Sequence, residues 1–300
     1  MPKGKELLKR VWVIGSGFMG RGIAQVCAQY GHSVSLVDPY ATVLTEARKD
    51  MNWSLEKLHL KGQAKENPLT ILKRVDFLRE PPASKKAEIL FECVPENLSF
   101  KKKVLISYDR LCPRGTIFAS NTSALPIGAL AAFTSRPDRF IGTHFASPPV
   151  IQKLVEMIPC LQTSQETIRS MRAFLLHLDR EIVEVQVDTA GFVMNRVYLA
   201  AAAEAIRLVE RGVAPAADID RAMRLGFGWT KGPLEAADLA GLDVIRGAMF
   251  SIWQTTGNTS YHPPETLIRL VEAGHLGRKT GRGFYDYQAQ GKNKKAGSPL

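Results

Sequence analysis

Short apolar runs alternate with amphipathic stretches through the first half of the chain. The clearest runs cover residues 10–14, 33–38, 89–94, 116–120 and 140–145. Several are apolar almost throughout, which is typical of strands buried on both faces of a parallel sheet. Two more strand candidates, 154–158 and 181–187, flank a helical pattern at 165–178. The pattern predicts an α/β domain over residues 1–188, with a parallel sheet and crossover helices.

The pattern changes after Asp188, where helical spacing with Gly and Pro punctuation replaces β-type runs up to Gly283-Phe284-Tyr285. The first helix has one buried stripe with three- and four-residue spacing that ends at Gly212. The stripe consists of Phe192, Asn195, Leu199, Ala202, Ile206 and Val209. Later helices can begin or end at Pro215, Gly226, Pro233, Pro264 and Gly274. We expect an all-helical domain at 189–288 and a disordered, Lys- and Gly-rich tail at 289–300.

The composition is that of an ordinary globular protein, with 45% apolar and 23% charged residues among 300. The net charge of +11 is compatible with a nucleic acid, an anionic membrane surface or a phosphate-bearing small molecule as partner. The basic runs Lys101-Lys102-Lys103 and 292–295 are isolated, and no aromatic-interleaved RNA motif occurs. Such runs are typical of solvated surface, so we expect no nucleic-acid partner.

Features of membrane and metal-binding proteins do not occur in the sequence. No apolar run approaches the roughly 20 residues that cross a bilayer, and the N-terminal residues lead into a strand without a signal-peptide core. The cysteines are scattered, without a CxxC pair or a His-rich neighbourhood, at Cys27, Cys93, Cys112 and Cys160. We expect a cytoplasmic protein with reduced thiols, no metal and no membrane partner.

A glycine motif follows the first predicted strand. Gly15-Ser16-Gly17-Phe18-Met19-Gly20 stands between that strand and a helical stretch at 18–30, as a dinucleotide-binding turn requires. Asp38 ends the next strand, where a carboxylate accepts hydrogen bonds from ribose hydroxyls and repels a 2′-phosphate. The motif therefore favours NAD over NADP, although the loop alone is compatible with a flavin. The alternative interpretation of Asp38 is a cap ahead of Pro39.

Two polar residues stand in apolar strands. His144 follows the run 140–143, and Glu156 interrupts the run 154–158. A buried carboxylate needs a cation or a donor, and on a neighbouring strand it would orient the histidine and favour its protonated form. Such a pair suits alcohol oxidation by a nicotinamide, because a base must take the hydroxyl proton as hydride leaves. Singly, each residue is compatible with a structural role; together, beside a dinucleotide turn, they favour catalysis. Asn195, polar within its stripe, needs either a backbone partner or a substrate carbonyl.

The chain resembles the 3-hydroxyacyl-CoA dehydrogenase family from Arg10 to about Tyr287. Seven motifs carry the resemblance in the family's order: Val13-Ile14-Gly15-Ser16-Gly17-Phe18-Met19-Gly20, Glu92-Cys93-Val94-Pro95-Glu96-Asn97-Leu98, Ser120-Asn121-Thr122-Ser123, Gly142-Thr143-His144-Phe145, Lys153-Leu154-Val155-Glu156, Gly191-Phe192-Val193-Met194-Asn195-Arg196 and Gly277-Arg278-Lys279-Thr280-Gly281-Arg282-Gly283-Phe284-Tyr285. Their joint presence is far more specific than any one of them.

The resemblance implies a Rossmann-like domain followed by a helical domain that forms a homodimer. It implies NAD-dependent oxidation of an L-3-hydroxyacyl-CoA, or the reverse reduction, with His144 as base and Glu156 as its orienting partner. Other implied roles are hydrogen bonding near the reacting oxygens by Ser123 and Asn195, cofactor binding by Glu96, Lys101 and Asn121, and contact with the coenzyme A nucleotide by Ser54 and Lys61. For Ser54 and Lys61, a solvated helix face is the alternative interpretation.

The sequence departs from the family beside the predicted base. The family's His-Phe-Phe-Asn-Pro is here His144-Phe145-Ala146-Ser147-Pro148, whose shorter side chains would widen or reshape the pocket. Acyl-chain preference and substrate class therefore stay open. Residues 92–103 also resemble the lambda-crystallin branch, so a free hydroxy or sugar acid such as L-gulonate is the alternative substrate, whereas the ending at 277–287 favours the hydroxyacyl-CoA enzymes. A third hypothesis is an inactive structural or nucleic-acid-binding protein. The joint presence of the four polar residues assigned to catalysis argues against it; these are Ser123, His144, Glu156 and Asn195.

Overall fold

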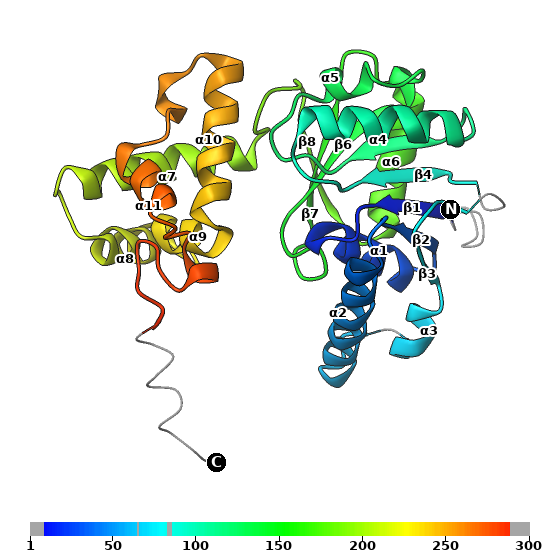
Figure 1. Cartoon of the computed structure of the whole chain (residues 1–300), viewed down its shortest axis with the longest axis horizontal. Helices are drawn as coiled ribbons and strands as arrows, with labels where there is room; N and C mark the ends of the chain where they lie inside the picture. The colour runs from blue at the N-terminus through cyan, green and yellow to red at the C-terminus, as the bar shows by residue number, and fades with distance from the viewer. Residues whose placement is uncertain (1–8, 65, 83–85, 289–300) are drawn as a thin grey trace. The chain divides into compact units, whose positions relative to one another are not determined.

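The computed structural model describes residues 9–64, 66–82 and 86–288, and the tail expected at 289–300 lies outside them. The chain divides into two compact units, of which the first ends at Thr189 and the second begins at Ala190. Each unit packs around a hydrophobic cluster of its own. Figure 1 shows the sheet of the first unit and the helices of the second.

Within the described residues, the first unit contains an eight-stranded sheet with the order β3-β2-β1-β4-β5-β6-β7-β8. The strands are β1 (Arg10–Ile14), β2 (Ser33–Val37), β3 (Val75–Leu78), β4 (Ile89–Glu92), β5 (Ile117–Ser120), β6 (Phe140–Phe145), β7 (Leu154–Pro159) and β8 (Glu181–Glu184). The first six run parallel, β7 is antiparallel to β6, and β8 is parallel to β7. Because β1 lies between β2 and β4, the chain leaves β1 where the strand order reverses, the usual ligand site of such sheets.

Helices cover both faces of this sheet. They are α1 (Phe18–Gln29), α2 (Ala41–Leu60), α3 (Pro68–Leu72), α4 (Leu98–Leu111), α5 (Ile127–Ala131), the 3-10 turn η1 (Pro137–Arg139) and α6 (Gln165–His177). Val11 and Val13 of β1 belong to the cluster that includes α1 and α6. The intervening Trp12 points to the opposite face, where its ring meets Tyr108 of α4 with 6.4 Å between centroids. The predicted α/β architecture is confirmed.

The second unit is helical, as predicted. Its elements are α7 (Met194–Glu210), α8 (Ala216–Phe227), α9 (Pro233–Ala240), α10 (Leu242–Thr256), η2 (Thr259–Tyr261), α11 (Glu265–Glu272) and η3 (Arg278–Thr280). The prediction that Gly226 ends a helix is wrong, because α8 continues through it to Phe227 and is capped by Gly228, whose φ of 72° is left-handed. The boundary between α9 and α10 was not predicted from the sequence, because only Gly241 stands between the two helices.

A buried carboxylate explains the C-terminal glycine motif. Asp238 of α9 is fully buried and accepts hydrogen bonds from the backbone N–H groups of Phe284 and Tyr285, both at 3.0 Å, and from the Tyr287 hydroxyl at 3.1 Å. A Cβ at Gly283 would stand 2.0 Å from Asp238 Oδ1. The motif at 277–287 therefore folds the end of this unit back onto α9.

Candidate active site

The glycine turn after β1 has a different requirement at each glycine. Gly15 has a φ of +95°, and a Cβ there would lie 2.7 Å from the Cys93 carbonyl oxygen. A Cβ on Gly20 would lie 1.9 Å from the Gly15 carbonyl oxygen. Around Gly17, by contrast, no atom of the described chain stands within 4 Å of a Cβ. Packing within the described chain therefore does not require glycine at position 17, and the space beside it is open.

The start of α1 adjoins that space. Gly17 caps the helix without a side-chain hydrogen bond, and its first turn contains no acidic residue. The first amide groups of a helix and its positive dipole end favour phosphate groups. These residues fit the pyrophosphate of a dinucleotide, as the sequence predicted for Gly15 through Gly20, Phe18 and Met19 included.

Asp38 lies beside this turn. Its Oδ2 accepts from the backbone N–H and the hydroxyl of Ser16 at 2.9 and 3.1 Å, and its Oδ1 accepts from the Tyr40 N–H at 3.1 Å. The carboxylate thus fixes the turn in addition to any contact with a ribose. A carboxylate has about four acceptor positions, so one remains for such a contact.

His144 and Glu156 face each other across two strands. β6 and β7 are antiparallel and pair His144 directly with Glu156. Nδ1 of the histidine lies 2.7 Å from Oε2 of the glutamate, whose side chain is fully buried while that of His144 is 11% exposed. The expectation that the strands lie side by side is confirmed. Such a carboxylate fixes the ring's orientation.

Arg180 holds the loop between these two strands. Its Nη1 donates to the carbonyl oxygens of Pro149 and Gln152, both at 3.0 Å, and its Nε donates to that of Leu178 at 2.8 Å. The loop contains the residues that depart from the family, Ala146 and Ser147, and the Ser147–Pro148 peptide bond is cis. The departure therefore sits in a loop that is anchored to the sheet beside the His/Glu pair.

A second polar cluster gathers at the ends of β4 and β5. Glu96 Oε1 accepts from the Thr122 hydroxyl at 2.5 Å, from the backbone N–H groups of Ser123 and Ala124 at 2.9 and 3.1 Å, and from the Ser123 hydroxyl at 3.3 Å. Burial opposes the ionisation of Glu96, but the Lys101 charge and the bonds from Thr122 and Ser123 hold its pKa below the usual value. Glu96 and Ser123, which the sequence assigned to different roles, are thus in direct contact.

Lys101 and Glu92 lie beneath that cluster. Their side chains are each 1% exposed and 2.7 Å apart. Burial acts to lower the pKa of Lys101, but Glu92 and Glu96 raise it above its usual value. The ammonium of Lys101, which the sequence predicted as a cofactor-lining residue, lies 2.7 Å from Glu92 Oε1 and 3.3 Å from Glu96 Oε2. Glu92 was not predicted as a site residue, although it follows a run of apolar strand residues just as His144 does.

The other predicted residues lie in several elements. Asn121 Oδ1 accepts from the Phe145 N–H at 3.0 Å and so holds the residue next to His144. Ser54 of α2 accepts from Gln25 of α1 at 3.0 Å, and Lys61 follows the last turn of α2. Asn195 lies in the first turn of α7, in the second unit, and is half-buried.

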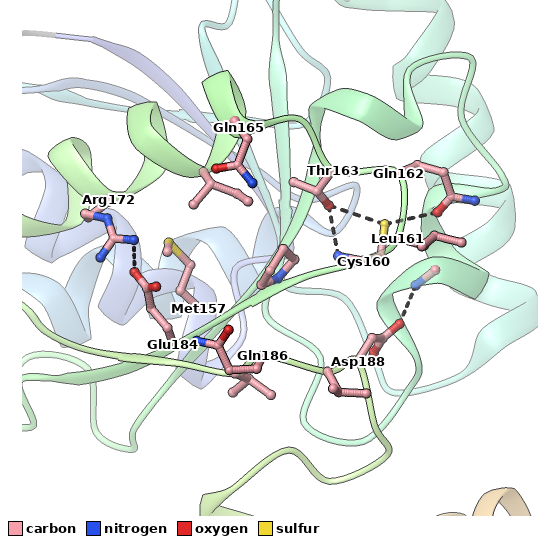
Figure 2. A pocket seen from close by; sticks show the side chains of 15 residues that line it. Met157, Cys160, Leu161, Gln162, Thr163, Gln165, Arg172, Glu184, Gln186 and Asp188 are labelled. Atoms are coloured by element: carbon pink, nitrogen blue, oxygen red, sulfur yellow. Dashed lines mark hydrogen bonds and ion pairs between the residues drawn. The ribbon is translucent and has the colours of Figure 1, made fainter.

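A cavity of about 910 Å³ opens elsewhere in the first unit, between α6 and the strands β7 and β8. Figure 2 shows that polar side chains around it already have partners: Arg172 with Glu184, Cys160 with Thr163 and Gln162, and Asp188 with a backbone amide. None of the predicted site residues lines this cavity. The glycine turn, Glu92, Ser120 and His144 instead lie at or near the carboxyl ends of β1, β4, β5 and β6.

Family models account for almost the whole chain. Residues 10–189 match the NAD-binding domain of 3-hydroxyacyl-CoA dehydrogenase, and residues 191–287 match the C-terminal domain of the same enzyme. The chain belongs to the 3-hydroxyacyl-CoA dehydrogenase family. It is an NAD-dependent oxidoreductase, and the resemblance predicted from the seven motifs is confirmed.

Individual relatives agree with this assignment. The chain is 39% identical to a probable 3-hydroxybutyryl-CoA dehydrogenase of Bacillus subtilis, over 94% of this chain and 98% of that one. It is 40% identical to the human mitochondrial hydroxyacyl-coenzyme A dehydrogenase, over 95% and 93% of the two chains. Among solved structures, the (S)-3-hydroxybutyryl-CoA dehydrogenase PaaH1 of Ralstonia eutropha is 36% identical and superposes with a TM-score of 0.88 over 93% of this chain and 99% of that one.

Two kinds of feature are absent from the described residues. No helix among them has the length and apolar character needed to span a bilayer. The same residues contain no cluster of three or more His, Cys, Asp or Glu side chains that could hold a metal ion.

Proposed function

We propose that the protein oxidises an L-3-hydroxyacyl-CoA to the 3-ketoacyl-CoA with NAD, or catalyses the reverse reduction, with His144 as the catalytic base. The observation that carries this proposal is the 2.7 Å contact between His144 Nδ1 and the buried Glu156 carboxylate. The pair stands at the end of β6, on the sheet edge to which the glycine turn after β1 also belongs. The family to which the chain belongs supports the substrate class.

Proton transfer follows from the geometry of the pair. Because Nδ1 faces Glu156, the exchange of a proton with the substrate falls to Nε2 of His144. In oxidation Nε2 takes the hydroxyl proton, and in reduction the protonated ring returns it to the carbonyl oxygen. The Glu156 carboxylate stabilises the imidazolium in both directions. NAD, when bound, accepts or supplies the hydride.

The remaining roles follow from the family resemblance. We propose that Ser123 and Asn195 donate hydrogen bonds near the reacting oxygens. We also propose that Asp38, Glu96, Lys101 and Asn121 lie along the cofactor, and that Ser54 and Lys61 contact the coenzyme A nucleotide. The contact between Ser123 and Glu96 supports a shared location for these two residues. We further propose a cytoplasmic homodimer that serves fatty acid β-oxidation; the unpaired state of the four cysteines agrees with a reducing compartment.

The decisive variant is His144→Gln. We expect acetoacetyl-CoA to drive NADH oxidation by the natural protein, and the variant to lose a factor of about 10² to 10⁴ in kcat, the usual contribution of a general base. NADH binding, followed by fluorescence titration, should stay nearly unchanged. His177→Gln is the matched control. His177 ends α6, and its Nε2 lies 3.2 Å from the carbonyl oxygen of Tyr30 rather than beside a carboxylate. Normal turnover by His144→Gln would exclude the assigned base.

The substrate class needs its own comparison, because Ala146 and Ser147 depart from the family pattern. Acetoacetyl-CoA reduction and L-gulonate oxidation should be measured with the same preparation, each with NAD(H) and NADP(H). We expect turnover of the thioester with NADH. A higher kcat/KM for L-gulonate would instead establish the free hydroxy acid as substrate.

A further inference from the structure

Glu92 is a fully buried carboxylate at the end of β4. Its Oε1 accepts from the Val94 N–H at 2.9 Å and from Lys101 Nζ at 2.7 Å, and its Oε2 accepts from Lys101 Nζ at 2.9 Å and from the Ser120 hydroxyl at 2.6 Å. These bonds occupy the acceptor positions that a carboxylate offers. Glu92 therefore ties β4, α4 and the end of β5 together at one buried point.

Two hydrogen-bonded routes lead from Glu92 to the segment that carries Ser123. In the first, the Ser120 hydroxyl also accepts from the Thr122 N–H at 3.3 Å. In the second, Lys101 Nζ lies 3.3 Å from Glu96 Oε2, while Glu96 Oε1 accepts from the N–H groups of Ser123 and Ala124. Both routes converge on residues 122–124.

Lys101 connects Glu92 to Glu96 within this network. The three N–H groups of its ammonium meet Glu92, Glu96 and, at 3.2 Å, the Val94 carbonyl oxygen. The Lys101 side chain is 1% exposed, so these contacts lie in the protein interior. Removing the Glu92 charge would leave this cation partly uncompensated in the interior, which is strongly unfavourable. The ammonium would then reorganise, and Glu96 with it.

We propose that Glu92 is a positioning residue that, through Lys101 and Ser120, holds residues 122–124 and thereby the Ser123 hydroxyl in the geometry for reaction. Lys101 transmits this restraint through its ion pairs with Glu92 and Glu96. The link to catalysis rests on the proposed function, which assigns Ser123 a hydrogen bond to a reacting oxygen. The mechanical part of the proposal does not depend on it.

Hydrogen exchange of the full-length protein tests the mechanical part. In Glu92→Gln we expect amide exchange in residues 121–125 to rise about tenfold or more, the effect of losing a charge-assisted hydrogen bond, while exchange in β2, which pairs only with β1 and β3 among the described strands, stays unchanged. The matched control is Glu88→Gln, which removes a carboxylate at the opposite end of the same strand, where it pairs with Lys9 and bonds the Arg10 N–H. Ser120→Ala, which keeps the ion pair, should raise exchange at Thr122 and decides the question if Glu92→Gln does not fold. Unchanged exchange in both variants would overturn the proposal.

A double-mutant cycle tests the catalytic part. With acetoacetyl-CoA and NADH, Glu92→Gln should lower kcat on the order of tenfold or more with little change in KM, after correction for the number of NADH-binding sites. If Glu92 acts through Ser123, the effects of Glu92→Gln and Ser123→Ala on log kcat will be strongly non-additive. Additive effects would overturn that link. A natural protein inactive on the thioester would refute the proposed function, and the exchange result would still decide the role of Glu92.

Discussion

Histidines in the first unit stand in opposite environments. His144 faces a carboxylate, whereas the fully buried His32 packs against the rings of Phe174 and His177, with centroids 4.8 and 5.1 Å away. The Lys9 N–H donates to its Nδ1 at 3.0 Å, and Nε2 has no hydrogen-bond partner in the described chain. Burial, reinforced by the neighbouring His177 and Lys9 against a smaller effect of Glu88, lowers the pKa of His32 to about 4. The folded protein therefore keeps this ring neutral.

Stability should depend on pH through His32. The unfolded chain protonates the ring near pH 6.5, while the folded chain holds it neutral down to about pH 4. Because the unfolded state binds more protons between these values, stability is full above pH 6.5 and falls as the pH decreases toward 4. In urea unfolding at pH 7 and pH 5, His32→Gln should lose about 2 kcal/mol less than the natural protein on acidification. The exposed His59→Gln should behave like the natural protein; an equal loss in all three would contradict the assignment.

At the scale of elements, two glycines of the turn between β1 and α1 have different roles: Gly20 is needed for packing, whereas Gly17 is expected to be needed for cofactor binding. Gly17→Ala meets no protein atom and has an ordinary φ of −61°, so the variant should fold with unchanged Tm. Its methyl group should nevertheless weaken NADH binding about tenfold or more, because the second glycine admits the pyrophosphate. Gly20→Ala places a methyl group against the Gly15 carbonyl and should destabilise the domain. Fluorescence titration and thermal unfolding distinguish the two; tight NADH binding by Gly17→Ala would contradict the assigned turn.

The same scale shows what the sequence could predict. Runs 10–14 and 140–145 coincide with β1 and β6, because continuous apolar character is a strong local signal. The edge strand β3 was not predicted, since it has only four residues, three of them half-buried, and includes Asp76. His144 and Glu156 were predicted as a pair because each interrupts an apolar run.

The network around Glu92 lay beyond such reasoning. Glu92 and Ser120 are 28 residues apart and meet only because β4 and β5 pair in one register. Lys101, in a run of three lysines, resembled solvated surface or a cofactor contact, and its burial depends on the packing of α4 over that register. The local sequence pattern predicts which strand ends carry polar side chains. Which of these side chains form hydrogen bonds or ion pairs with one another depends on the pairing of strands that are distant in the sequence.

At the scale of the molecule, the second unit leaves a pair of neighbouring large apolar side chains exposed. The second unit has its own core around α7, α9 and α10, yet it also exposes large apolar side chains at the end of α8, with Leu225 81% and Phe227 76% exposed. Full burial of such side chains contributes roughly 1.5–3 kcal/mol each. A second copy of the chain would supply that burial, in agreement with the homodimer that we propose.

The assembly prediction follows directly. Light scattering after size exclusion should give the natural protein about twice the 33.1 kDa mass of one chain, and Leu225→Glu combined with Phe227→Glu should reduce it to the mass of one chain, because a charge buried without a partner opposes association. Leu161→Glu is the matched control, since Leu161 is 97% exposed in the first unit and should leave the dimer intact. NADH binding, which belongs to the first unit, should survive in all variants. A monomeric natural protein, or a dimer unaffected by the paired substitution, would show that this end of α8 is not the interface.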